Sequence, residues 1–145
     1  MQIIRTIAGI LVGLIIGSIA NMGLILTGAA VVPPPQGVDP SQAESIAASI
    51  HLFELKHFIF PFLAHAIGTL VGATIAYLLS SEHKIVSAYT VGCLFLLGGI
   101  TTAFMIPAPI WFISFDLVFG YIPMAFLAIK IGLSITPQKG SKANN

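Results

Sequence analysis

The chain has 145 residues, of which 57% are hydrophobic and only 8% are Asp, Glu, Lys or Arg. A soluble domain carries about 25% charged residues, so these few charges cannot cover a water-facing surface, and lipid must surround most of the chain. The formal net charge of +1 offers no basic patch for a nucleic acid. The one cysteine has no partner for an intramolecular disulfide and says nothing about the redox compartment.

The first predicted membrane span covers residues 7–26, in a stretch without charge between Arg5 and Asp39. A helix needs about 20 apolar residues to cross the bilayer core. A cleavable signal peptide is the alternative, but its apolar segment is only about 7–15 residues long. Because this segment is longer and carries a patterned face, we expect it to be retained. Its face of regularly spaced glycines predicts close helix packing: Gly9, Gly13 and Gly17.

A long loop at residues 31–56 follows and begins with three prolines, which favour an extended polyproline segment. Asp39 followed by Pro40 is typical of a helix N-cap with proline at the first helical position. Ser41 and Glu44 offer a capping box one register later. Apolar residues then recur at helical spacing: Ile46, Ile50 and Phe53. We therefore predict a short amphipathic helix at about residues 40–55, which either plugs the end of the bundle or docks a partner.

Three further apolar segments follow, at about residues 58–79, 85–105 and 110–129. The polar turn 82–84 separates the first two of them. Pro107 and Pro109 separate the last two, because proline disfavours helix at the residue before it and lacks an amide donor. The tail at residues 136–145 consists mainly of Gly, Ser, Lys and Asn and is predicted to be disordered.

These segments predict the fold class. Strands of a membrane β-barrel would alternate apolar and polar residues over about ten positions, and these longer runs do not alternate. The sequence therefore predicts an all-α membrane protein, a four-transmembrane-helix bundle of two helical hairpins with a short amphipathic outer helix. The bundle forms a single transmembrane domain at residues 1–135.

The proline string of the loop also carries a resemblance to known proteins. With four spans and Pro33-Pro34-Pro35-Gln36-Gly37-Val38-Asp39-Pro40, the chain resembles a group of uncharacterised small bacterial membrane proteins with Pro-Pro-Pro-x-Gly-x-Asp-Pro in an outer loop. In that group a polar residue or histidine often precedes the prolines, whereas Ala29 to Val32 stand there in this chain. The resemblance covers the architecture and this string, and it implies no activity.

The distribution of Lys and Arg predicts the orientation, because these residues in short loops favour the cytoplasmic side. With the N-terminus inside, the cytoplasmic segments hold five of them: Arg5, Lys84, Lys130, Lys139 and Lys142. The outer segments hold only Lys56. We predict a multi-pass protein of the inner (plasma) membrane with both termini in the cytoplasm. The long loop would then face the periplasm of a Gram-negative cell.

Three polar side chains fall within the predicted spans, on faces that also carry small residues: Asn21, His65 and Asp116. At a rise of ~1.5 Å per residue, each lies roughly 9–13 Å from the outer end of its helix. Thr102 can join them, and Gly68 and Gly72 share the face of His65. A carboxylate at the centre of a span costs roughly 2.5–3.5 kcal/mol, which a partner normally offsets. We therefore predict that His65 and Asp116 meet in the bundle interior.

The remaining histidines and aromatic residues give weaker evidence for a functional site. His51 and His57 are six residues apart, which does not place them on one helix face, so no metal site and no other cofactor are expected. Trp111 and Tyr121 are interpreted as interface or packing aromatics. The titratable groups within the spans are too few for us to expect an enzyme.

Two functions remain open at this level. The first is an accessory or scaffold subunit of the inner membrane, which packs through its glycine faces into a homo-oligomer or a larger membrane complex. The second is a small oligomeric transport or proton-conducting protein that uses the cluster of Asn21, His65, Asp116 and Thr102. The lipid bilayer is the partner in both cases, and the sequence favours the first because it requires no further feature.

Overall fold

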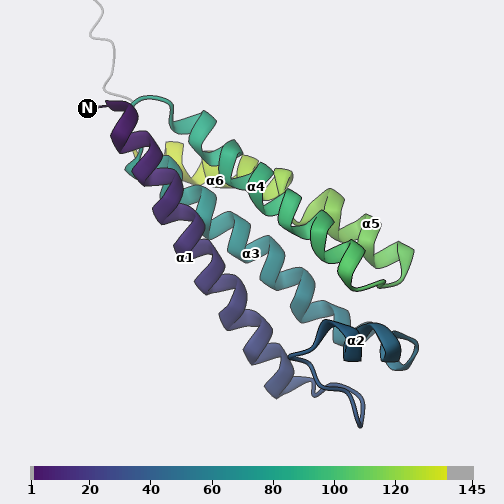
Figure 1. Cartoon of the computed structure of the whole chain (residues 1–145). Coiled ribbons are helices and arrows are strands. Elements are labelled where there is room, and N and C mark those ends of the chain that lie inside the picture. Colours follow the sequence, from purple (N-terminus) through teal and green to yellow (C-terminus); the bar gives the residue numbers. More distant parts are fainter. Residues whose placement is uncertain (1, 137–145) are drawn as a thin grey trace, which may run out of the picture.

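The computed structural model describes residues 2–136, so the tail predicted to be disordered lies outside the described residues except for Thr136. Four long apolar helical segments pack as a bundle, with a short helix at one end (Figure 1), which confirms the predicted fold class. The elements are α1 (Gln2–Val31), α2 (Ala43–Ser49), the 3-10 turn η1 (Ile50–Leu52), α3 (Leu55–Leu79), α4 (Lys84–Met105), α5 (Ile110–Phe119) and α6 (Ile122–Ile135).

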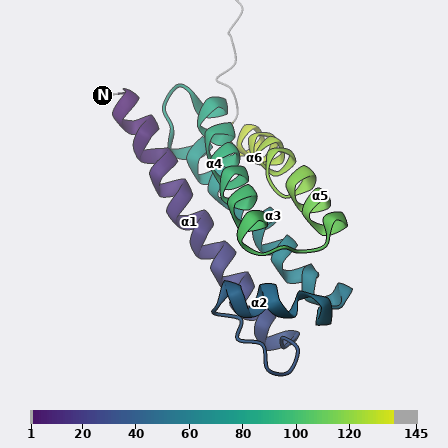
Figure 2. The ribbon, with the colours of Figure 1, turned by 45° about the vertical axis from the view of Figure 1, so that its right-hand side comes forward.

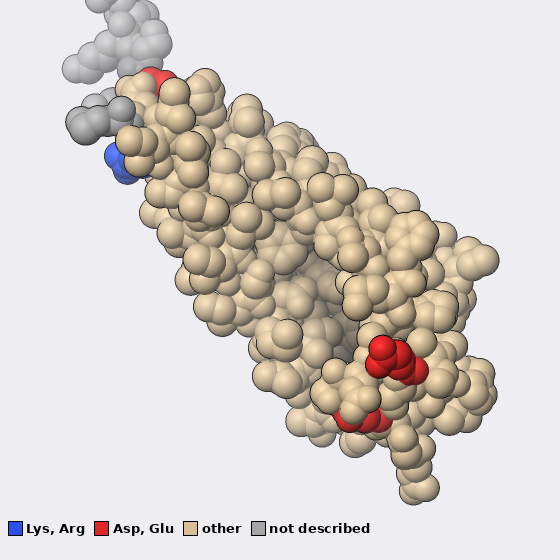
Figure 3. Space-filling view, in the orientation of Figure 1, with Lys and Arg blue, Asp and Glu red and all other residues tan. Residues whose placement is uncertain are grey.

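Four helical segments are long and apolar enough to cross a membrane: α1, α3, α4 and the segment formed by α5 with α6. Their mean hydropathy lies between 1.7 and 2.2. In the view of Figure 3 the flank of the bundle carries no Lys, Arg, Asp or Glu, and such side chains lie near its two ends. Large apolar side chains such as Leu11 and Phe104 are exposed along the spans. The protein is therefore a small multi-pass integral membrane protein.

The contact between α1 and α3 is the most extensive one between two helices of the described chain. Gly9, Gly13 and Gly17 are buried along the face that α1 turns to α3. An alanine Cβ at Gly13 would lie 2.5 Å from the carbonyl oxygen of Gly72, and one at Gly17 would lie 2.6 Å from that of Gly68. The backbones of the two helices thus touch. The glycine face of α1 packs within its own chain, a point that the sequence left open.

The half of the bundle that is farther from α2 is a packed apolar core. Gly92 of α4 lies against Ala125 of α6, and Gly132 of α6 lies against the ring of Tyr77 in α3. The buried side chains of this core come from three spans: Ala73, Ala76, Tyr77, Ala88, Val91, Ala125, Ala128 and Ile129. Small residues therefore set the helix spacing here, as the van der Waals packing of membrane helices requires.

The fourth span is interrupted, which corrects the single continuous helix predicted at residues 110–129. α5 ends at Phe119 and α6 begins at Ile122. Pro123 explains the interruption, because it has no amide hydrogen for the carbonyl of Phe119 and its ring would clash with that turn. Between the two helices, Tyr121 has a non-helical backbone, with φ −128° and ψ −76°. Because of this interruption, the Tyr121 side chain does not point in the direction that a continuous helix would give it.

The helix of the long loop begins later than predicted. Helical structure starts at Ala43, not at residue 40. Asp39 does not cap it, because its Oδ1 accepts hydrogen bonds from the backbone amide of Ser41 at 2.9 Å and from its hydroxyl at 2.6 Å. These bonds, that of the hydroxyl first, hold the pKa of the Asp39 carboxyl below its usual value. The N-cap is Gln42, and it makes no side-chain cap bond, so the predicted capping box of Ser41 with Glu44 is wrong.

The helix also ends earlier than residue 55. η1 ends at Leu52, and Phe53 has an extended backbone. Glu54 then caps α3 in a capping box with His57, whose Nδ1 accepts the backbone amide hydrogen of Glu54 at 2.9 Å. The chain therefore starts a new helix instead of continuing the old one. Figure 2 shows α2 lying across the end of the bundle, which we call the loop end.

Candidate functional site

His65 of α3 and Asp116 of α5 meet inside the bundle, as the sequence predicts. Nδ1 of His65 lies 2.9 Å from each carboxylate oxygen of Asp116. Asp116 is 4% exposed, and the His65 side chain is 19% exposed. The carboxylate lies in the last turn of α5, where the helix dipole disfavours negative charge. Hydrogen-bond donors around Asp116 must therefore stabilise it. We call these two residues the His65–Asp116 pair.

Tyr121 is a third member of the site, although its sequence context suggested only an interface or packing aromatic. Its hydroxyl donates a hydrogen bond to Oδ2 of Asp116 at 3.0 Å. Its ring stacks on the imidazole of His65, with 5.6 Å between centroids. Gly99 of α4 makes room for the phenol, because a Cβ there would collide with the Tyr121 hydroxyl. In the sequence, the one signal that could have placed Tyr121 at the site is Pro123. A proline interrupts the helix and thereby changes which residues share a face.

The other two members of the predicted cluster, Asn21 and Thr102, make no hydrogen bond to the pair among residues 2–136. Asn21 of α1 packs against Gly68, where an added Cβ would lie 2.8 Å from the Cβ of Asn21. Among residues 2–136, the hydrogen bonds of the pair come from its own two members and from Tyr121, and none from Asn21. Thr102 donates its hydroxyl to the carbonyl of Gly98 at 3.0 Å. It lines the same cavity as the pair, so it is a neighbour of the site.

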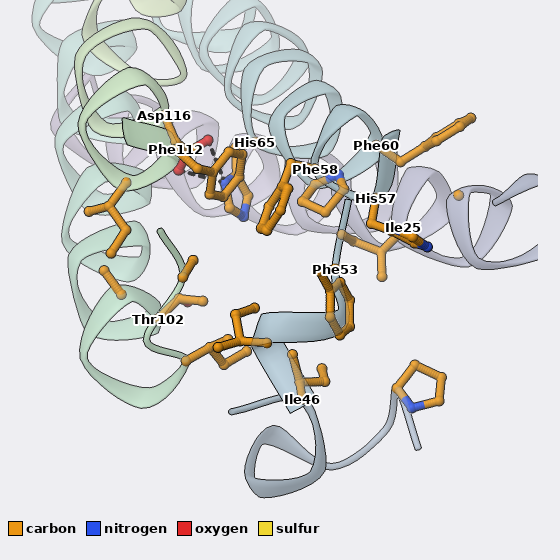
Figure 4. A pocket seen from close by; sticks show the side chains of 18 of the residues that line it. Ile25, Ile46, Phe53, His57, Phe58, Phe60, His65, Thr102, Phe112 and Asp116 are labelled. Atoms are coloured by element: carbon orange, nitrogen blue, oxygen red, sulfur yellow. Dashed lines mark hydrogen bonds and ion pairs between the residues drawn. The ribbon is translucent and has the colours of Figure 1, made fainter. Parts of the chain in front are cut away.

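A cavity of about 450 Å³ opens beside the pair at the loop end. Its walls come from the ends of α1 and α4, the long loop with α2 and η1, the beginning of α3, and α5. In Figure 4, His65 and Asp116 lie at one side of this space, and Ile46 and Phe53 lie across from them. The apolar face of the loop helix therefore covers the cavity. This arrangement matches the plug that the sequence offered as one role of the loop.

The cavity opens on the flank of the bundle. Gly17 of α1 lies near the ring of Phe95 in α4, but closer to the loop end the two helices diverge (Figure 1). Figure 3 shows a hollow there, between α1 and α4 and next to the long loop. Met22 of α1 and Thr102 of α4 both line the cavity and are exposed. The opening therefore lies between two of the candidate membrane spans.

The hydrogen bonds of the pair fix which nitrogen of His65 is free. Both short contacts of Asp116 are made to Nδ1 of His65, and an ionised carboxylate only accepts hydrogen bonds, so with Asp116 ionised it is Nδ1 that carries the hydrogen between them. Nε2 has no hydrogen-bond partner among residues 2–136, and the ring lines the cavity. Nε2 is therefore the ring nitrogen of His65 that is accessible from the cavity.

Within the part of the chain that the structure describes, no group of three His, Cys, Asp or Glu residues could hold a metal ion. Comparisons of the chain with family models, curated proteins and solved structures found no match. The resemblance of the proline string to small bacterial four-span proteins therefore stays a prediction. The class of protein rests on the fold, a small integral membrane protein with four spans.

Proposed function

We propose that this protein is a small membrane transport protein in which the His65–Asp116 pair exchanges a proton with the contents of the cavity. The observation that carries the proposal is the placement of His65 between a buried carboxylate and the cavity. Asp116 holds one ring nitrogen at 2.9 Å, and the other has no hydrogen-bond partner among residues 2–136. An ionisable pair of this kind within a span is typical of proton relays in pumps and transporters.

The distribution of space within the bundle supports transport. The cavity occupies the loop end, whereas the opposite half is closed by the apolar core around Tyr77, Val91 and Ile129. A transport protein that alternates access is open to one side and packed on the other. The structure fits such a state, with the site accessible through the opening on the flank, near the loop end. Four spans give a thin wall around a path, so we expect the working unit to be a homo-oligomer.

The accessory or scaffold function was expected to use either the glycine faces or the long loop as its surface for a partner. The glycine face of α1 gives it no support. Gly9, Gly13 and Gly17 instead contact α3 of the same chain. An accessory role would therefore need a different surface. No observation at the lipid-facing surface favours one, whereas the cavity and the pair both favour transport.

We also propose the orientation that the Lys and Arg distribution predicts. At the end opposite the loop, Arg5 of α1 donates from Nε to the carbonyl of Leu79 at 3.1 Å, next to Lys84 at the start of α4. The loop end holds Lys56, which pairs with Glu54 at 3.0 Å. By the positive-inside tendency, the loop end faces outward from an inner membrane. The cavity would then receive its contents from the outer side.

Proton flux into liposomes tests the proposed function. The purified protein is reconstituted with a pH-sensitive dye inside, and a potassium gradient with valinomycin drives protons inward. We expect flux above that of empty liposomes. Asp116→Asn should abolish this flux, because a neutral amide cannot stabilise a charged imidazole. The amide oxygen can still accept hydrogen bonds from His65 and Tyr121, so the packing should be kept. Glu82→Gln in the exposed turn before α4 is the matched control and should conduct like the wild type.

Two outcomes would overturn the proposal. One is wild-type flux no higher than that of empty liposomes. The other is Asp116→Asn protein that conducts as well as the wild type. Elution volume on size exclusion should be the same for all variants, which separates lost flux from lost assembly.

A further inference from the structure

We infer that the cavity binds a neutral lipophilic molecule with a hydroxyl group, an alcohol or a phenol, which enters from the membrane and donates its hydrogen bond to Nε2 of His65. The inference rests on the proposed function, because the cavity is taken as the transport site, and it names the class of cargo. It follows from the size and lining of the cavity, from the free hydrogen-bonding atoms, from the charge and from the opening.

The size and lining of the cavity select a largely apolar molecule. Its volume of about 450 Å³ lies within the ~300–1,000 Å³ of ordinary small-molecule sites. Of the side chains that line it, only four are polar: His57, His65, Thr102 and Asp116. The remainder are aliphatic or aromatic side chains, glycines and prolines. Such walls offer apolar surface to the body of a ligand and hydrogen bonds to one small group.

Most of the polar groups of the cavity are already engaged. Asp116 accepts hydrogen bonds from His65 and Tyr121. His57 accepts one at Nδ1 from the Glu54 amide. The hydroxyl hydrogen of Thr102 is donated within α4. The free position beside the pair is Nε2 of His65, which is an acceptor while the imidazole is neutral. A ligand hydroxyl matches it, and an ether or a hydrocarbon does not.

The charge around the cavity disfavours a carboxylate or phosphate on the ligand. Among the residues that line the cavity there is no Lys or Arg. Asp116 lies at its inner side, and Asp39 and Glu44 are exposed on the long loop. Residues 31–56 of the long loop contain one Lys or Arg side chain, Lys56, and it forms an ion pair with Glu54. An anion would therefore lose its hydration without gaining a positive partner. Fatty acids and phospholipid head groups are poor ligands for this site.

The opening on the flank gives a route for a lipophilic molecule. It lies between α1 and α4 at the level of the spans (Figure 3), so a molecule dissolved in the bilayer reaches it without crossing water. The long loop covers the end of the cavity with Ile46 of its helix and with Phe53 beyond it (Figure 4). A hydroxyl that points inward from this opening can approach His65, while its apolar body stays against the helices.

Three probes with the same ten-carbon chain test the inference: 1-decanol, decanoate and decane. Binding to the full-length protein in detergent is followed by the emission of Trp111, the one tryptophan in the chain. Its ring packs on Phe58 and Phe112, which both line the cavity, at centroid distances of 5.5 Å and 5.8 Å. At about pH 8 a free carboxyl is ionised. We expect decanol to bind at least about tenfold more tightly than decanoate or decane, a difference of about 1.4 kcal/mol.

Two variants and a control assign the binding to the cavity and to Nε2. His65→Asn keeps a donor near Asp116 but lacks the atom that faces the cavity, so the preference for decanol over decane should disappear. Ala103→Phe places a ring in the cavity and should abolish binding of every probe. Leu97→Phe places the same ring on the exposed face of α4, outside the cavity, and should bind like the wild type.

Three results would overturn the inference: decanoate that binds as tightly as decanol, a preference for decanol that survives in His65→Asn, or probe binding that survives in Ala103→Phe. The first two reject the class of ligand, and the third rejects the site. Proton flux is measured separately in liposomes. Decanol binding without flux would therefore reject the proposed function alone, and flux without selective decanol binding would reject the class of cargo alone.

Discussion

Gly13 offers the sharpest test of how the bundle is held together. Its Cα faces the backbone of α3 so closely that an added Cβ would lie 2.5 Å from the carbonyl oxygen of Gly72 and 3.0 Å from the Cβ of Ala76. Neither neighbour is the flexible end of a side chain, so rotamer changes cannot relieve the clash. Gly13→Ala should force α1 and α3 apart along the contact that also includes Gly9 and Gly17.

The size of the effect follows from the structure and from a matched glycine. An added methyl in a tightly packed contact typically costs about 1–3 kcal/mol. The same change raises helix propensity by up to about 1 kcal/mol. Gly23, in the same helix, has nothing within 4 Å of its Cβ position. Gly23→Ala therefore carries the propensity gain without the clash. The propensity gain cancels between the two variants, so their free energies of unfolding should differ by about 1–3 kcal/mol, with Gly13→Ala less stable.

Thermal unfolding in detergent, followed by circular dichroism, measures the difference. For a chain of this size, 1 kcal/mol corresponds to a shift of about 2–4 °C, so the two variants should separate by about 2–12 °C. Gly13→Leu should be worse than Gly13→Ala, because the larger side chain cannot leave the contact. Equal unfolding temperatures for Gly13→Ala and Gly23→Ala would refute the close approach of α1 and α3.

Two further predictions concern the site and the topology. Tyr121→Phe removes the donor to Oδ2 of Asp116 but keeps the stacked ring. It should lower the free energy of unfolding in detergent by about 1 kcal/mol. This value lies between the ~0.6 kcal/mol average for hydrogen bonds between membrane helices and the ~1.5–3 kcal/mol of hydrogen bonds to charged groups. An unchanged unfolding temperature would count against the bond. Reporter fusions in the long loop and at the C-terminus should give signals from opposite sides of the membrane, with the loop outside, and a cytoplasmic signal from the loop would reverse the orientation.

Most of the architecture could be predicted from the sequence, because the bilayer restricts the choices. Apolar runs of sufficient length must form helices when they cross lipid, since every backbone group needs an internal partner. The glycine face of α1 likewise predicted close packing, but it could not identify the partner. That identity depends on Gly68 and Gly72 lying at matching heights on α3, which a helical pattern in one segment does not reveal.

The loop shows where local signals mislead. Asp39, Pro40 and Ser41 satisfy the sequence rules for a helix start, yet the Asp39 carboxylate bonds to Ser41 and closes a turn instead. Asp and Ser serve both motifs with the same hydrogen bonds, so composition cannot separate them. The apolar spacing was the more reliable signal, because Ile46 and Phe53 do face the cavity.

The site was predictable in part for a related reason. His65 and Asp116 are the polar residues that a lipid environment cannot leave alone, and the cost of a lone carboxylate led to their contact. Tyr121 could not be placed in the same way. It is five residues beyond Asp116, which on a continuous helix would point it away from that side chain. The interruption before Pro123 removes this constraint, and the tyrosine reaches the carboxylate.

The energetics of the pair bear on its purpose. A carboxylate within a span costs roughly 2.5–3.5 kcal/mol on insertion scales. Asp116 has two side-chain partners, His65 and Tyr121, and helix–helix hydrogen bonds in membranes average only ~0.6 kcal/mol each. Even at the ~1.7 kcal/mol maximum measured for such bonds, the two together would barely offset the insertion cost. Stability therefore gives little reason for an ionisable group at this position. A structural clasp would also satisfy both nitrogens of the imidazole, whereas Nε2 of His65 is free beside a cavity. Proton exchange accounts for both observations, because it requires a carboxylate that can hold a charged imidazole and a ring nitrogen that stays accessible.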